Sequence, residues 1–166
     1  MNNLKLGVRL GIAFAISLIL IVTLAVVGYS RIETLAKSAD SLVNNRFPKT
    51  VQANNIIDAI NNIARQLRNA YIVSGEESKK ALDAIPEQRR IITENIEKLE
   101  RTVVSDAGKA IMSRVKESRA AYVVQQDRFI ELLKAGKRDE IPGLLTGDLR
   151  KTQSAYLKAV NDLIQM

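Results

Sequence analysis

The chain has 166 residues, a formal net charge of +7, and no cysteine, histidine or tryptophan. These absences exclude Cys/His zinc sites, thiol nucleophiles and histidine acid–base catalysis, so we expect no enzyme, no metal site and no cofactor. The basic charge would suit nucleic acid, but the chain has no aromatic–basic motif and no glycine-rich phosphate loop, so we expect no nucleic acid and favour a small anionic partner.

The first predicted element is a membrane span at residues 10–30. These residues are uncharged and mostly apolar, and Lys5, Arg9 and Arg31 flank them. A helix of this length can cross a bilayer core of about 30 Å. The main alternative is a cleaved signal peptide, whose apolar region is shorter, about 7–15 residues, and ends in a small-residue cleavage site. We therefore expect a retained anchor.

The charges around the span predict its orientation. Lys5 and Arg9 precede it, and no acidic residue occurs before Glu33. Positive charge is retained on the cytoplasmic side of a membrane. We therefore expect a cytoplasmic tail at residues 1–9, a transmembrane helix at 10–30 in the inner membrane, and a periplasmic domain at 31–166.

Four helical segments are predicted after the span. Phe47-Pro48, Ser74-Gly75, Ser105-Asp106 and Gly136 followed by Asp139 supply helix ends, caps or interruptions. The segments carry helical periodicity and lack the alternation of strands. Because the connections are short, we predict an all-α fold: an N-terminal transmembrane helix followed by an antiparallel up-down-up-down four-helix bundle.

Residues that recur at spacings of three and four define the predicted bundle seams. In chain order the seams are Ile56, Ile60, Ile63, Leu67; Leu82, Ile85, Arg89, Ile92, Ile96, Leu99, Val103; Val115, Arg119, Tyr122, Gln126, Phe129, Leu133; and Leu149, Thr152, Tyr156, Val160, Leu163. Ile57, Ala64 and Tyr71 widen the apolar face of the first segment. This width predicts that the first segment buries one surface in the bundle and another against a partner.

Polar residues occupy several seam positions, and counting from the membrane-distal turns places them within about four residues, or roughly 6 Å, of one level. They are Arg89, Arg119, Tyr122, Gln126, Thr152 and Tyr156. One interpretation is that the arginines reach out to solvent while the hydroxyls are satisfied in the core. The other is an anion pocket between helices, favoured because the seams contain no carboxylate and two buried arginines without an anion would be costly.

Three further motifs carry a resemblance to a known family. They are Asn44-Asn45-Arg46-Phe47-Pro48-Lys49-Thr50, Arg119-Ala120-Ala121-Tyr122 and Gly147-Asp148-Leu149-Arg150-Lys151, and they follow an opening Leu4-Lys5-Leu6-Gly7-Val8-Arg9-Leu10-Gly11. With these motifs the chain resembles the N-terminal part of a methyl-accepting chemotaxis receptor of the organic-acid-sensing type.

The resemblance implies a ligand-binding sensor that is a homodimer through its first helix and that shifts its last helix along the membrane normal. It implies a di- or tricarboxylate ligand, although an amino acid also suits the residues. Arg65, Arg68 and Thr152 are the nearest counterparts of ligand-binding residues in the aspartate-type receptors, and Arg89, Arg119, Tyr122 and Tyr156 are the candidates from the seams.

Two alternatives remain open on the sequence. The chain could be the sensor front end of a histidine kinase or cyclase, or a ligand-free membrane-anchored helical adaptor. Such receptors continue into a second membrane span and a cytoplasmic signalling coiled coil, so we expect residues 31–166 to be a sensor whose last helix stops before that span.

Overall fold

The computed structural model describes residues 5–165, apart from the side chain of Asn45, and is helical with no strand within that range. The all-α prediction is therefore confirmed for the described residues. The chain divides between Arg46 and Phe47 into two compact units. Residues 1–4, which include Leu4 of the opening motif and part of the predicted cytoplasmic tail, lie outside the described residues, as does Met166. The boundaries at residues 9 and 30 stay predictions.

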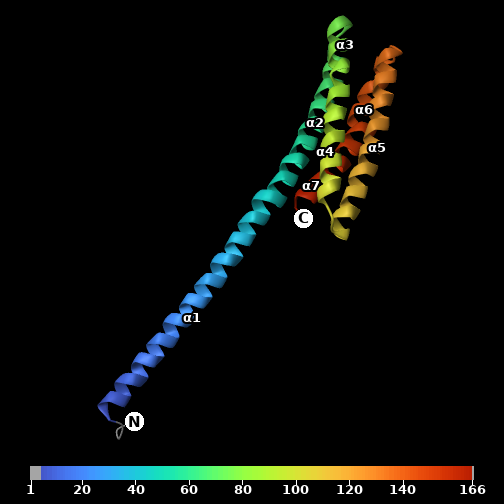
Figure 1. The fold of residues 1–166 in the computed structure, drawn as a ribbon. Coiled ribbons are helices and arrows are strands. Elements are labelled where there is room, and N and C mark those ends of the chain that lie inside the picture. Colours follow the sequence, from blue (N-terminus) through green and yellow to red (C-terminus); the bar gives the residue numbers. More distant parts are fainter. Residues whose placement is uncertain (1–4, 166) are drawn as a thin grey trace. The chain divides into compact units, whose positions relative to one another are not determined.

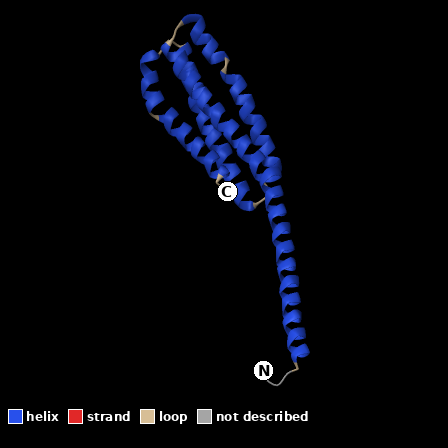
Figure 2. Cartoon of the chain, turned by 90° about the vertical axis from the view of Figure 1, so that its left-hand side faces the viewer, coloured by secondary structure: helices blue, strands red, loops and turns tan. Residues whose placement is uncertain are grey.

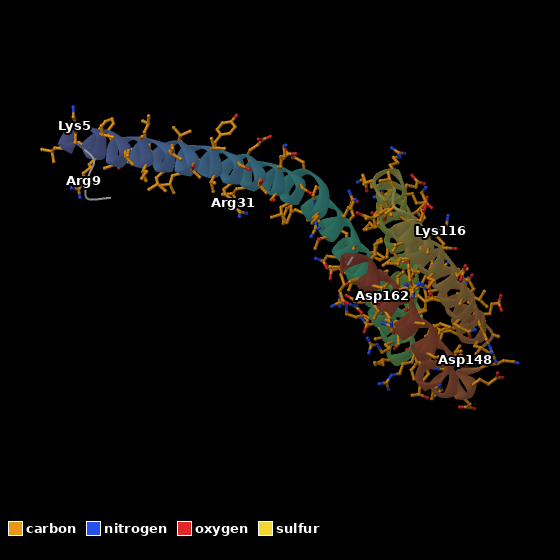
Figure 3. All side chains as sticks on the ribbon, turned by 90° about the horizontal axis from the view of Figure 1, so that it is seen from below. Lys5, Arg9, Arg31, Lys116, Asp148 and Asp162 are labelled. Carbon is orange, nitrogen blue, oxygen red and sulfur yellow. The ribbon has the colours of Figure 1, made fainter. Side chains whose placement is uncertain are left out.

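The first unit is helical from Leu6 onward, as α1 (Leu6–Ser41) and the π-helical turn η1 (Leu42–Arg46). Residues 10–30 fall inside α1, which has no buried residue. Figure 3 shows Lys5 and Arg9 at the start of α1 and Arg31 further along it. The helix is long and apolar enough to cross a membrane. A core helix of a soluble protein would instead be mostly buried.

The predicted interruption near Phe47-Pro48 is present as η1, directly ahead of α2 (Phe47–Ile72). Proline has no N–H to donate to the carbonyl four residues earlier, and its ring would clash with that carbonyl in an α-helix. A π-helical turn changes the hydrogen-bonding register and is a known way to accommodate such a conflict. The α-helical pattern therefore changes one turn earlier than the proline itself.

The second unit is the four-helix bundle. Its elements after α2 are α3 (Gly75–Asp83), α4 (Ile85–Thr102), α5 (Asp106–Lys134), the 3₁₀ turn η2 (Arg138–Glu140), α6 (Ile141–Thr146) and α7 (Asp148–Ile164). Figures 1 and 2 show α2, the α3–α4 pair, α5 and the α6–α7 pair side by side. Helix α2 contacts α3, α4 and α7, and α5 contacts α6 and α7. This arrangement confirms the predicted bundle.

The predicted helix signals near the turns are present. Gly75 and Gly136 adopt positive φ angles of 62° and 72°, which glycine reaches without a Cβ penalty. Ser105 is the N-cap of α5, and its side chain accepts a hydrogen bond from the backbone N–H of Gly108 at 3.2 Å. These local features place the ends of the long helices.

Two breaks in the helices were not predicted. The second segment is divided at Ala84, just ahead of Pro86, and the fourth is divided at Gly147. Proline is accepted in the first turn of a new helix, where no N–H is needed. At Gly147 a Cβ would lie 2.8 Å from the backbone oxygen of Gly143, so only glycine fits this turn without movement.

The bundle core follows the predicted seams. Fully buried apolar residues come from all four segments: Ile56, Ile60, Ile63, Leu67, Leu99, Val115, Phe129 and Val160. Near-complete burial of such side chains contributes about 1.5–3 kcal/mol each. The core therefore lies entirely in the second unit.

Helix α2 corrects one prediction. Its broad apolar face is used within the bundle, where Ala53, Ala59, Ala64 and Ala70 are buried beside the isoleucine row. The outward row of α2 is polar and consists of Asn54, Asp58, Asn61, Arg65 and Asn69. The prediction of a second apolar surface for a partner is wrong, because four neighbouring elements, α3, α4, α5 and α7, already cover the wide face.

Candidate functional site

Two tyrosines form the centre of the polar layer in the core. Tyr122 of α5 and Tyr156 of α7 are each 1% exposed, and their ring centroids lie 6.4 Å apart with the ring planes at 53°. Neither hydroxyl has a hydrogen-bond partner among the described residues. Burial raises the pKa of both phenols. Nearby positive charges act in the opposite direction on each pKa, from Arg68 and Arg89 at Tyr122 and from Arg119 at Tyr156.

The two seam arginines bridge α4 and α5. Arg89 donates from Nε to Gln126 Oε1 at 3.0 Å and from a terminal nitrogen to Asp127 Oδ1 at 2.7 Å. Arg119 donates to Thr93 Oγ1 at 2.6 Å. The polar seam residues from α4, α5 and α7 therefore lie close together, as the counting from the turns predicted.

The environment of Arg89 differs from the prediction. Its side chain is 30% exposed, and Asp127 supplies a carboxylate from the position beside the seam residue Gln126. Arg119 is also only half-buried. The premise that two buried arginines require an external anion is therefore wrong, because one arginine has an internal carboxylate and neither is fully removed from water. Ligand binding by Arg89, Arg119, Tyr122 and Tyr156 stays a prediction.

Thr152 and Arg65 make hydrogen bonds to residues nearby in the sequence rather than to other residues of this layer. The hydroxyl of Thr152 donates to the backbone oxygen of Asp148 at 2.8 Å, within its own helix. Arg65 is exposed on the outward row of α2 and donates to Asn62. The role of both side chains in ligand binding stays a prediction.

Arg68 lies in a different place, a groove between α2 and the α6–α7 pair with a volume of about 580 Å³. We call it the α2–α7 groove. It is lined by Ala64, Arg68, Leu145, Thr146, Leu149, Arg150 and Gln153. The lining includes two arginines and no carboxylate.

The two arginines of the α2–α7 groove have free donor capacity. Arg68 uses its Nε on the backbone oxygen of Ala64 at 3.1 Å, which leaves its two terminal nitrogens. The side chain of Arg150 makes no hydrogen bond or ion pair with any described residue. Gln153 donates to Asn61 Oδ1 at 3.5 Å and so links α7 to α2 beside the groove. The groove therefore presents two guanidinium groups from two helices to one space.

Guanidinium groups are suited to carboxylates because their fork of N–H donors matches two carboxylate oxygens. Residues 3–166 match the family described as the four helix bundle sensory module for signal transduction. The chain belongs to this family. The sensory module is a membrane receptor domain of methyl-accepting chemotaxis receptors, and its family is one of signal transduction rather than of enzymes.

The family confirms the resemblance and the function class, while the organic-acid-sensing branch stays a prediction. Comparisons of the sensory module with curated proteins and with solved structures give no match.

Three polar residues around these sites were missed as functional candidates. Asp127 lies just beside a seam position, and Thr146 and Arg150 lie just beside the start of the last seam. Residues next to a seam position lie at the edges of helix–helix contacts. A search of these neighbouring positions would therefore have identified the three residues. In the sensory module these flanking positions reach the grooves beside seam residues such as Leu149.

Proposed function

We propose that this sensory module detects a small di- or tricarboxylate bound in the α2–α7 groove. The observation that supports the proposal is the pair Arg68 and Arg150, whose guanidinium groups share a groove that no carboxylate lines. An anion that contacts both guanidinium groups offsets the repulsion between their positive charges. Thr146 and Gln153 add polar atoms that can orient the ligand, and Leu145 and Leu149 add apolar walls.

The lining also favours organic acids over amino acids. A bound amino acid presents an ammonium group, which needs acceptors and preferably a carboxylate. The residues that line the α2–α7 groove include no aspartate or glutamate. A ligand with only anionic and hydroxyl groups therefore fits the groove better than a zwitterion.

A ligand in this groove would act on two helices at once. Arg68 belongs to α2 and Arg150 to α7, so an anion held by both arginines favours one position of α7 along α2. A ligand can shift a conformational equilibrium only through different contacts in the two states. We propose that binding changes the axial position of α7, in the way that the family resemblance implies.

Titration calorimetry of the full chain in lipid nanodiscs tests the proposal, with succinate and citrate as probes and empty nanodiscs as the blank. We expect one of the two acids to bind, and the double variant Arg68→Ala/Arg150→Ala to bind it about tenfold more weakly or worse. The matched control is Arg101→Ala/Arg128→Ala, which removes the same charge from two exposed positions outside the groove.

Two results would overturn the proposal. The first is no heat of binding for either acid at millimolar concentrations, which would support a ligand-free adaptor. The second is equal weakening in both double variants, which would show that only the net charge matters. A loss confined to Arg68→Ala/Arg150→Ala supports the groove.

We also propose that the bundle is periplasmic, with the membrane span in the inner membrane, and that two copies associate through α2. The positive residues Lys5 and Arg9 ahead of the span support the orientation. The outward row of α2 supplies the contact, so we expect a polar interface rather than an apolar one. Labelling and cross-linking of a single cysteine at position 58 test both proposals.

A further inference from the structure

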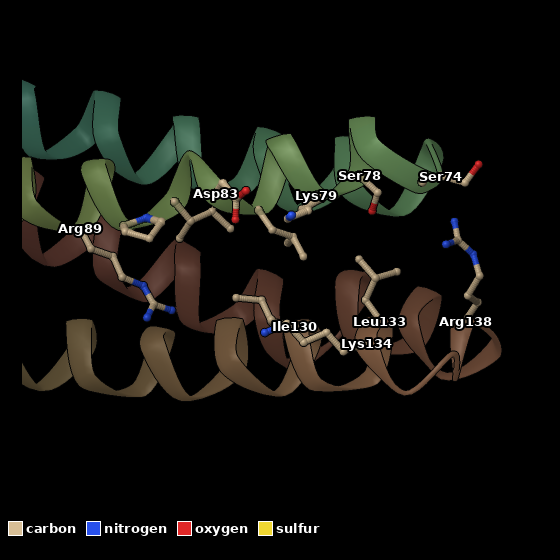
Figure 4. Close-up of a pocket in the computed structure, with 13 residues that line it drawn as sticks. Ser74, Ser78, Lys79, Asp83, Arg89, Ile130, Leu133, Lys134 and Arg138 are labelled. Atoms are coloured by element: carbon tan, nitrogen blue, oxygen red, sulfur yellow. The ribbon is translucent and has the colours of Figure 1, made fainter.

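A second groove lies between the α3–α4 pair and α5. It occupies the end of the bundle that contains Gly75 and Gly136, and its volume is about 640 Å³ (Figure 4). We call it the α3–α5 groove. Its apolar lining consists of Leu82, Ile85, Pro86, Ile130 and Leu133. Small-molecule sites in proteins have volumes of about 300–1,000 Å³ and mostly apolar walls with a few polar groups.

The charged residues of the α3–α5 groove are mostly cations. Lys79 of α3 and Lys134 of α5 come from opposite walls, and neither side chain makes a hydrogen bond or ion pair with any described residue. Arg89 and Arg138 lie at the two ends in Figure 4. Asp83 is the one carboxylate in the lining. The groove is therefore cationic over an apolar floor.

The two ends of the groove differ in whether the charge of their arginine is compensated. Arg89 is already paired with Asp127, so its charge is largely compensated. Arg138 has no carboxylate partner among the described residues: it lies 5.1 Å from the centre of the Tyr71 ring and donates to the backbone oxygen of Tyr71. These two contacts hold the guanidinium in place before any ligand arrives. The uncompensated charge thus lies at the Arg138 end and at the two lysines.

We propose that the α3–α5 groove is a second ligand site, and that its ligand is an amphipathic monocarboxylate with an aromatic or branched apolar body. The apolar floor favours such a body over a small, fully hydrophilic acid, because burying apolar surface contributes about 25 cal/mol per Å². The carboxylate is placed by Lys79, Lys134 and Arg138. Asp83 repels a second negative charge on the α3 wall.

This site is independent of the α2–α7 groove, because the two grooves share no lining residue. Its ligand would bridge α3 and α5, whereas the ligand of the α2–α7 groove would bridge α2 and α7. One chain could therefore respond to two chemical classes of acid.

Fluorine NMR of the full chain in lipid nanodiscs tests the proposal. The probes are para-trifluoromethylbenzoate and its neutral counterpart para-trifluoromethylbenzyl alcohol, with empty nanodiscs as the blank. We expect the benzoate to bind with saturation and the alcohol to bind at least about fivefold more weakly, because the alcohol lacks the charge. Lys79→Ala/Lys134→Ala should weaken benzoate binding about fivefold to tenfold.

Two variants sharpen the test. Lys80→Ala/Lys98→Ala removes the same charge from exposed lysines that do not line the groove, and should leave the benzoate affinity unchanged. Asp83→Asn removes the one lining carboxylate and should strengthen binding about twofold to fivefold. A gain of affinity cannot result from misfolding.

Arg68→Ala/Arg150→Ala separates the two sites and should not change benzoate binding. The proposal is overturned if the benzoate does not saturate, if the two lysine double variants behave alike, or if loss of Arg68 and Arg150 is what abolishes binding. Failure of succinate and citrate to bind would overturn the α2–α7 proposal and leave this one standing.

Discussion

At the scale of single residues, the unusual feature is the pair Tyr122 and Tyr156, whose buried hydroxyls have no partner among the described residues. An unsatisfied buried polar group costs about 1–3 kcal/mol. The two rings stabilise the fold, since both are buried and in contact. The pair is thus stabilising through its rings and destabilising through its oxygens.

Burial of these phenols predicts a loss of stability at alkaline pH. The pKa of each tyrosine is raised in the folded state above its ordinary value of about 10. The folded protein therefore keeps two protons that the unfolded chain releases above about pH 10. Stability from this source is fully present below that pH and should fall by about 1.4 kcal/mol per pH unit for each tyrosine as pH rises further.

The double variant Tyr122→Phe/Tyr156→Phe isolates this effect. Urea unfolding followed by circular dichroism should give a shallower alkaline decline for the variant, by about 2.7 kcal/mol per pH unit. At neutral pH the variant should be as stable as the natural chain or more so, because it loses no hydrogen bond. Equal alkaline slopes in the two proteins would show that the hydroxyls are hydrated in solution.

At the scale of elements, the start of each helix depends on a few local contacts. Ser105 caps α5 through its hydrogen bond with Gly108, whereas Ser74 holds the same position before α3 without a side-chain cap bond. Serine is preferred at both positions for the same reason, namely the orphan N–H groups of the first turn. The two serines therefore form a natural comparison.

Ser105→Ala should lower the free energy of unfolding by about 1 kcal/mol, because it removes a formed N-cap bond. Ser74→Ala should change it by a few tenths of a kcal/mol at most. Urea unfolding of both variants in the same detergent measures the difference. If Ser74→Ala cost as much as Ser105→Ala, the Ser74 side chain would have to cap α3 in solution.

At the scale of the whole molecule, the two units differ in how their apolar side chains are covered. The residues of α1 are exposed in the described structure, and the buried core belongs to α2 through α7. A helix of exposed leucine, isoleucine and valine requires a nonpolar environment, which a bilayer supplies. The bundle needs no such environment, because its seams are closed within the unit.

A single cysteine can test both the orientation and the dimer, since the natural sequence has none. Asp58 lies on the exposed row of α2, and Glu117 lies on the exposed surface of α5. The two variants are therefore Asp58→Cys and Glu117→Cys. Both should react with a membrane-impermeant maleimide added to cells whose outer membrane has been opened. Under mild oxidation, Asp58→Cys should form disulfide-linked dimers at least about tenfold faster than Glu117→Cys, by its higher local concentration.

The labelling and the cross-linking fail independently. Protection of both cysteines until the inner membrane is opened would place the bundle in the cytoplasm and reverse the proposed orientation. Equal rates of dimer formation for the two variants would remove α2 as the interface while leaving the orientation intact.

The sequence by itself determined the elements of this protein. The apolar run at 10–30, the Ser105 cap and the Gly75 and Gly136 turns are local signals, and the period of the seams is a property of each helix alone. For that reason the bundle and its core residues could be predicted. The breaks at Ala84 and Gly147 could have been predicted from local residues, namely Pro86, Pro142 and Gly147. These signals are weaker than the helical periodicity that continues through both breaks.

Only the tertiary structure decided which charges meet. The sequence placed Arg89 in the polar layer, but its pairing with Asp127 depends on the register and rotation of α4 against α5. Likewise, Arg68 and Arg150 come from helices far apart in the sequence, and their shared groove depends on how α7 packs beside α2. Helical periodicity determines which face of a helix is buried. The partners of a residue across antiparallel helices are determined by packing, which the sequence of one helix alone does not reveal.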